Sequence, residues 1–259
     1  MSAPTDPSRL SLREFAEKFA DQMVPLTNTF SYFSLATRLS EDDTREYLNE
    51  PIAALPPGVA AVMPKVSILL APHLERANGK EKQVQDYLSL EKPAEGRSRL
   101  SASMELAGGA ALLAFALKDQ DVADYHYAFY REIAALLAGR WPPEQQTQYF
   151  SLLREELGAN VHGEVDEASW HLKQGLLRRQ TNLRRETKAF CEYAQQSFVD
   201  TLTLYLHGIC CDIDVDTGPR QLPSRFLRRR LVLLESLYPP PEGYAVFPEE
   251  LGAPPEPRQ

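Results

Sequence analysis

The longest helical pattern in the sequence runs from about residue 163 to residue 210. Apolar side chains at helical spacing mark one side of it: Val165, Ala168, Leu172, Leu176, Leu183, Phe190, Ala194 and Phe198. At about 1.5 Å per residue, one continuous helix would be roughly 70 Å long, which exceeds the diameter of a compact domain this size. The helix must therefore bend, break, or project towards a partner, and Gly175 offers a point for a bend.

Helical spacing also dominates other parts of the chain. Ser11 and Glu14 have the spacing of a capping box at the start of an amphipathic helix. Residues 98–118 carry small side chains beside Gly108 and Gly109, which would let a second helix approach closely, so we expect the central helix here. Further helices are expected at 121–138, 143–157 and 223–237.

These patterns predict an all-α fold. We expect a multi-helix bundle with one long helix near 163–210 and irregular proline-rich connections. The expected organisation is a single helical domain over 1–238, with its bundle core at 98–211. A proline-rich acidic tail, 239–259, follows this domain.

For two segments the sequence pattern does not decide between strand and helix. Residues 28–39 combine the alternation of a strand with the spacing of a helix. The apolar run VSILL at 66–70 fits either a short buried strand or a turn of buried helix, and it lies in a segment where prolines break regular elements.

Charge and cysteine content limit the class of protein. The 28 basic and 36 acidic residues give a net charge of −8, so the chain has no global attraction to nucleic acid. Three cysteines without spaced pairs, and an N-terminus without a signal pattern, favour a cytoplasmic protein with reduced thiols. The most apolar window, residues 104–117, includes Glu105 and is too short to span a bilayer, so no transmembrane segment is expected.

One candidate metal site lies at the start of the long helical pattern. Glu164, Glu167 and His171 would share one helix face, and carboxylates with an imidazole can hold a transition metal inside a helical bundle. This set supports an alternative function, a metal-dependent helical-bundle oxidoreductase. Against it, no second copy of the motif occurs, and acidic residues also suit an exposed first turn of a helix.

Two weaker metal patterns lie further along the chain. His207, Cys210 and Cys211 offer ligand types that zinc prefers, but a closed zinc site needs a second ligand pair. The alternating acids Asp212, Asp214 and Asp216 with Gly218 resemble a calcium loop whose glycine and twelfth position do not fit. Two small buried thiols near a helix end and a solvated turn are the favoured explanations of these patterns.

Two basic clusters suggest a surface for binding a partner. The first is Lys173, Arg178, Arg179, Arg184, Arg185 and Lys188, and the second is Arg220, Arg225, Arg228, Arg229 and Arg230. Arginine favours planar, hydrogen-bonded pairing with acidic groups. The candidate partner-binding residues are Arg178, Arg185, Arg225, Arg228 and Arg229.

The helix expected at 223–237 is amphipathic. It could dock on its own bundle, enter a groove of a partner, or lie on an anionic membrane surface. Arg230 lies near its apolar side, where the stem could pack.

The sequence favours a non-catalytic function. It contains no nucleophile elbow, phosphate-binding glycine loop, dinucleotide fingerprint or zinc-protease motif. We therefore expect an adaptor or regulatory protein that binds other proteins through its long helix and its C-terminal basic helix, without a cofactor. Specific nucleic-acid binding is not expected, whereas peripheral membrane contact and self-association fit the same charge pattern.

Overall fold

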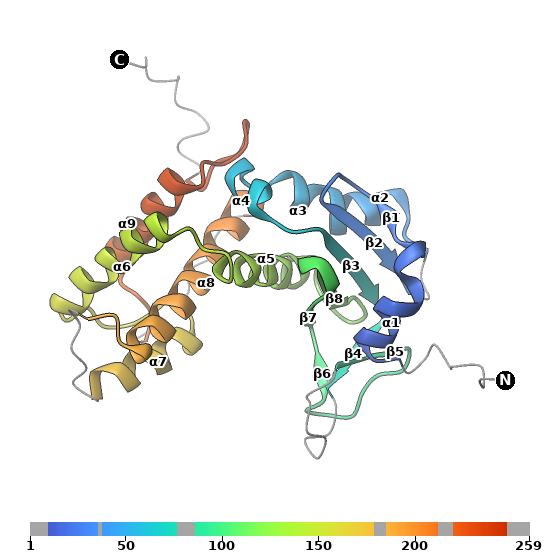
Figure 1. Cartoon of the computed structure of the whole chain (residues 1–259), viewed down its shortest axis with the longest axis horizontal. Helices are drawn as coiled ribbons and strands as arrows, with labels where there is room; N and C mark the ends of the chain where they lie inside the picture. The colour runs from blue at the N-terminus through green and yellow to red at the C-terminus, as the bar shows by residue number, and fades with distance from the viewer. Residues whose placement is uncertain (1–9, 36–37, 77–85, 179–184, 212–219, 248–259) are drawn as a thin grey trace. The chain divides into compact units, whose positions relative to one another are not determined.

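The computed structural model of the chain describes residues 10–35, 38–76, 86–178, 185–211 and 220–247. The chain forms two compact units. Unit 1 comprises Met1–Ile52 and Met63–Glu132, and unit 2 comprises Ala53–Val62 and Ile133–Gln259. Both units are labelled by their elements in Figure 1.

Unit 1 contains two β-sheets, so the expected all-α helical bundle is wrong. The five-stranded sheet has the order β1-β2-β3-β8-β7, in which β2, β3 and β8 are parallel and the two outer strands are antiparallel to their neighbours. Its strands are β1 (Val24–Pro25), β2 (Phe30–Ser34), β3 (Val66–Ala71), β7 (Ser101–Glu105) and β8 (Ala111–Ala116). The smaller sheet has the order β5-β4-β6 and consists of β4 (His73–Arg76), β5 (Asp86–Ser89) and β6 (Ser98–Arg99).

The predicted central helix at 98–118 is where the sequence interpretation failed most clearly. This segment forms β6, β7 and β8, and β7 and β8 pair as a hairpin from Ser101↔Phe115 to Glu105↔Ala111. Gly108 and Gly109 have φ of +74° and +78° in the connecting turn, a conformation that glycine adopts without strain. The small residues therefore serve a turn and a sheet rather than a helix contact.

Strand β8 is apolar along its whole length because both faces of the large sheet are covered there. On one face, Leu69, Leu112 and Ala114 belong to a core cluster with Phe15 of α1 (Leu12–Phe19). On the other face, Phe115 of β8 packs against aromatic rings of α5 (Val122–Ala138). Every residue of β8 is buried, so the alternation that would identify a strand is missing.

The remaining helical parts of unit 1 follow sequence signals more closely. The capping box of α1 is present, since the Ser11 and Glu14 side chains each accept the backbone N–H of the other residue. The two segments whose local structure the sequence left undecided, 28–39 and 66–70, contain β2 and most of β3. Between them lie α2 (Glu41–Thr44), a π-helical stretch (Arg45–Asn49) and α3 (Glu50–Ala53).

Unit 2 is helical. It contains α4 (Pro57–Val62), the end of α5, α6 (Pro143–Gly158), α7 (Glu167–Arg178), α8 (Lys188–Cys210) and α9 (Ser224–Leu237). Helices α6, α7 and α9 each contact α8, and α6 also contacts α9. Aromatic rings fill the space between α6 and α8, with the Trp141 and Phe198 rings stacked at 3.7 Å between centroids. The core of this unit is therefore organised around α8.

The long helical pattern at 163–210 breaks into two helices. Residues 185–187 are not helical, and Thr187 caps the start of α8 with its side chain. The two helices contact each other along their lengths, and the backbone N–H of Ser169 in α7 donates to Asp200 in α8. The apolar stripe that suggested one long helix thus belongs to two helices that pack together. Among the described helices, none has the length and apolarity needed to cross a membrane.

Candidate functional site

Four charged side chains form a buried ion cluster in unit 2: Glu156, Glu164, Lys173 and Arg230. They come from α6, from the segment before α7, from α7 and from α9 respectively. The Arg230 guanidinium donates from Nη2 to Glu156 Oε2 at 2.6 Å and from Nη1 to Glu164 Oε2 at 2.7 Å. Each of the four side chains is at most 1 % exposed.

Glu164 is the most heavily bonded member of the buried ion cluster. Besides Arg230, its carboxylate accepts hydrogen bonds from Lys173 Nζ at 3.0 Å and from the Tyr193 hydroxyl at 2.5 Å. Burial alone would raise the pKa of Glu164, but the charges and hydrogen bonds of Arg230 and Lys173 outweigh it and lower the pKa to about 2. Glu164 is therefore ionised across the neutral range, as a buried ion pair requires.

A short piece of backbone pairing fixes the Glu164 position. Glu164 forms an isolated bridge with Gln221: its N–H donates to Arg220 O, and its carbonyl accepts from Leu222 N. The preceding residue, Gly163, has a φ of +81° and offers its carbonyl to Lys173 Nζ at 2.8 Å. This pairing connects the segment before α7 with the segment before α9.

The buried ion cluster also determines which face of α9 meets solvent. Arg230 points inward together with Leu227, Leu231 and Leu234, which are buried. The opposite face of α9 and one face of α6 then form the two walls of a groove of about 810 Å³, which we call the α6/α9 groove. Its lining residues follow helical spacing on each wall: Gln148, Ser151, Leu152 and Glu155 on α6, and Arg225, Arg228, Arg229, Val232, Leu233 and Ser236 on α9.

The α6/α9 groove combines apolar surface with positive charge. Val232 is 48 % exposed and supplies apolar surface to the wall of the groove on α9. Three arginines and one glutamate line the groove, and the glutamate, Glu155, pairs with Arg229 Nη2 at 2.8 Å. The groove is thus basic although the whole chain carries a charge of −8.

The predicted partner-binding arginines occupy two separate regions of unit 2. Arg225, Arg228 and Arg229 line the α6/α9 groove, whereas Arg178 is the exposed last residue of α7 and Arg185 is exposed before α8. Of the other residues of the first basic cluster, Lys188 is exposed in the first turn of α8. Lys173 is buried in the ion cluster, and Arg179 and Arg184 lie outside the described residues.

The candidate metal ligands Glu164, Glu167 and His171 do not share one helix face. Glu164 precedes α7, and both of its oxygens accept hydrogen bonds within the buried ion cluster. Glu167 and His171 lie on the exposed side of α7, 3.4 Å apart, and Arg220 also pairs with Glu167. Each carboxylate therefore has a cationic or histidine partner of its own.

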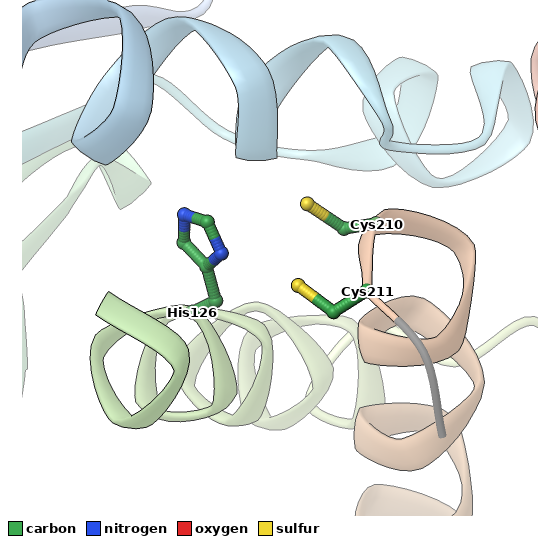
Figure 2. Close-up of side chains that lie close together, drawn as sticks. All are labelled: His126, Cys210 and Cys211. Atoms are coloured by element: carbon green, nitrogen blue, oxygen red, sulfur yellow. The ribbon is translucent and has the colours of Figure 1, made fainter. Parts of the chain in front are cut away.

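The candidate zinc residues His207, Cys210 and Cys211 lie at the C-terminal end of α8. Figure 2 shows Cys210 and Cys211 at the C-terminal end of α8, and their sulfur atoms lie within 4.8 Å of each other. Cys211 N donates to the carbonyl of His207, so this contact uses the backbone of His207. The candidate calcium residues Asp212, Asp214, Asp216 and Gly218 lie outside the described residues.

Sequence reasoning missed the inward position of Glu156 and Arg230. Each lies on the apolar side of its helix: Glu156 follows the spacing of Leu152 and Leu153, and Arg230 follows that of Leu227 and Leu234. Two opposite charges at core positions of separate helices are the signal that could have indicated a buried pair. From the sequence we expected only the aliphatic stem of Arg230 to pack along the apolar side of its helix.

Comparisons with models of protein families, with curated proteins and with solved structures give no match for this chain.

Proposed function

We propose that the chain is a non-catalytic adaptor or regulatory protein whose α6/α9 groove binds an acidic amphipathic segment of a protein partner. The observation that carries the proposal is the exposed Val232 between arginines on the outer face of α9. An amphipathic helix in a groove offers apolar side chains at helical spacing, and acidic residues beside them would pair with the arginine rim.

Charge complementarity favours an acidic occupant. Arg225 and Arg228 are exposed, and their guanidinium groups lie over the rings of Phe226 and Phe247, at 4.6 and 4.5 Å from the centroids. Such stacking limits the motion of the side chain and holds the guanidinium group in place. Among the described lining residues Glu155 is the one acid, and it pairs with Arg229, so it adds little like-charge repulsion to a carboxylate-rich segment.

The two faces of α9 have different roles in this proposal. The inner face holds the helix on unit 2 through three leucines and the buried ion cluster. Deleting α9 would therefore disturb folding and binding together. Substitutions on the exposed face change the groove without touching the buried cluster, so they separate the two effects.

The test uses a fluorescent amphipathic peptide of about 18 residues, long enough to form a bound helix, with leucines on one face and glutamates beside them. Fluorescence anisotropy measures its binding to the full chain. We expect saturable binding that weakens at least about tenfold in the double variant Arg225→Glu/Arg228→Glu, since two attractive pairs become repulsive. The matched control, Arg178→Glu/Arg185→Glu, changes the charge equally outside the groove and should alter binding less than about twofold.

Three results would overturn the proposal. The first is equal binding of the same peptide with lysine in place of glutamate, which would remove the charge argument. The second is a larger loss of binding in the control variant than in the groove variant. The third is displacement of the peptide by phosphatidylserine vesicles but not by neutral vesicles, which would assign the groove to an anionic membrane surface instead of a protein.

Crosslinking from Val232 offers a way to identify the cellular partner. A photo-crosslinking side chain at Val232 should capture a protein in the native cell, and the captured segment should be acidic and amphipathic. The corresponding synthetic segment must bind the purified chain and must lose affinity in Arg225→Glu/Arg228→Glu. A captured segment that binds both forms equally would contradict the proposed groove.

A further inference from the structure

A crevice of about 490 Å³ lies in unit 1 at the carboxyl ends of three parallel strands. Backbone hydrogen bonds continue the pairing beyond β2, β3 and β8: Leu35 N donates to Leu70 O at 2.8 Å, and Leu117 N donates to Ala71 O at 2.9 Å. Parallel strands with helical connections bind ligands preferentially at this edge, where the chain leaves the sheet. The volume lies within the range of sites that hold small organic molecules.

The walls of the crevice are mainly aliphatic. They include Leu35, Leu39, Leu70, Leu90 and Leu117. Leu70 is fully buried at the base, while Leu90 is 37 % exposed. These walls suit an apolar ligand body and do not by themselves select a head group.

A lysine supplies the charge that selects a head group. Lys118 lines the crevice, and its backbone N–H donates to Pro72 O at 3.1 Å, which fixes it beside the end of β3. Within the described residues its ammonium forms no ion pair; the adjacent Asp119 pairs with Lys92 at 3.4 Å. A lysine at the edge of an apolar hollow attracts a carboxylate more strongly than in open water, because the walls exclude solvent.

The acidic residue in the lining is already engaged elsewhere. The Asp43 carboxylate accepts the backbone N–H of Ser40 at 3.0 Å, which caps the start of α2, and this bond lowers the pKa of Asp43. It therefore stays ionised and acts as a helix cap, and among the described lining residues Lys118 is the one cation with which a ligand anion can pair.

A buried histidine directly follows the crevice lining in the chain. His73 directly follows the lining residue Pro72 and is only 4 % exposed, yet its Nε2 has no hydrogen-bond partner among the described residues. Burial, and then the neighbouring charge of Lys118, lower the pKa of His73, so the ring is neutral near pH 7. Buried ring nitrogens of this kind are commonly satisfied by an ordered water molecule, so the charge preference of the crevice rests on Lys118.

We infer that this crevice binds a small organic carboxylate with an apolar body, whose head group pairs with Lys118 while its body lies against the leucines. This inference concerns unit 1 and is independent of the function proposed for the α6/α9 groove in unit 2. It assigns the unit a ligand class without assigning it a reaction.

Octanoate is the probe, with octylammonium as a ligand of equal chain length and opposite charge. Calorimetric titration of the full chain should show saturable octanoate binding, and octylammonium should bind at least about tenfold more weakly. Lys118→Glu should weaken octanoate binding about tenfold, because one attractive pair becomes repulsive. Leu90→Trp should weaken it as well by filling the crevice, without reversing the preference for the carboxylate.

Lys65→Glu is the matched control. Lys65 is exposed directly before β3, at the amino end of the parallel strands, and it does not line the crevice. It should change octanoate affinity less than about twofold. The inference fails if octanoate does not saturate the chain at about 20 mM, a concentration well above a millimolar Kd. Equal binding of octylammonium, or an unchanged affinity in Lys118→Glu, would overturn it too.

Discussion

Arg230 and Glu164 form a paired contact from which solvent is excluded, with Nη1 at 2.7 Å from Oε2 and Nη2 at 3.1 Å from Oε1. Glu156 accepts from the remaining Nε of the same guanidinium, at 3.1 Å to Oε2. With Lys173 the buried ion cluster contains two positive and two negative side chains. The charges balance only while all four are present. Removing any one side chain leaves a buried charge uncompensated, which costs stability.

Replacing Arg230 should therefore destabilise unit 2 strongly. Arg230→Met keeps much of the apolar stem but leaves two buried carboxylates with less compensation, and we expect a loss of about 3–5 kcal/mol in the free energy of unfolding. The neighbouring Arg229→Met removes only an exposed pair with Glu155 and should cost less than about 1 kcal/mol. Urea unfolding followed by circular dichroism distinguishes them, and similar losses in the two variants would contradict the buried cluster.

The buried ion cluster also predicts an acid-sensitive stability. The pKa of Glu164 falls from 4.5 to about 2 on folding, so the stabilisation is complete above pH 4.5 and is lost as the pH falls towards 2. The size of this contribution is on the order of 3 kcal/mol. In Glu164→Gln the titrating group is absent, and its unfolding free energy should depend less steeply on pH in this window. Equal slopes in the two proteins would show that Glu164 does not titrate with folding.

Gly163 should tolerate no side chain. Its φ of +81° disfavours other residues, and a Cβ there would lie 2.1 Å from Gln221 O. We expect Gly163→Ala to lower the unfolding free energy of unit 2 by more than about 2 kcal/mol, since the bridge to Gln221 must move. Gly158→Ala is the control, because a Cβ at the last residue of α6 meets nothing within 4 Å. A thermal melt in which both variants behave alike would contradict the close approach at Gly163.

Two alanines distinguish the observed sheet from the helix that the sequence suggested. Ala114 is fully buried in β8 between Leu69 and Ala102, so Ala114→Leu should overpack the core and cost about 1–3 kcal/mol. Ala107 lies exposed in the turn between β7 and β8, so Ala107→Leu should stay within about 0.5 kcal/mol. A helix at 98–118 would instead make Ala107 a packing position, and a large loss there would favour it.

Helices with clear boundaries could be predicted from the sequence. Ser11 with Glu14 indicated the start of α1, and the amphipathic spacing before Pro239 gave α9 nearly its observed bounds. These signals are local, because a cap or a proline acts on neighbouring backbone groups only. The break between α7 and α8 was one of the outcomes that the length of the pattern left open, but Gly175 lies within α7 and does not mark it.

The sheet could not be recognised because its most deeply buried strand, β8, lacks a period of two. β8 is buried on both faces, so its sequence from Ala111 to Ala116 is apolar throughout and matches a helix equally well. The glycine pair before it was interpreted as a helix-packing feature, although Gly108 and Gly109 form a turn. Only the pairing of β8 with β3 and β7 decides between these interpretations, and that information is not local in sequence.

The candidate site was predicted in part. The exposed arginines Arg225, Arg228 and Arg229 were found from the amphipathic pattern of α9, and they line the α6/α9 groove. The walls of that groove depend on how α6 lies against α9, which no spacing within either helix reveals. The crevice beside Lys118 was not anticipated, since a carboxyl edge of parallel strands exists only once the sheet is known.

The parallel pairing of β2, β3 and β8 also affects the kinetics of folding of unit 1. The register Phe30↔Val66 and Val66↔Ala111 joins residues that are distant along the chain, with α2, α3 and the small sheet in the intervening segments. Long loops must close before these strands gain any contact, which slows the crossing of the folding barrier. During this interval the apolar strand β8 is without its parallel neighbour β3, so unit 1 should aggregate more readily while it folds than after its sheet has closed.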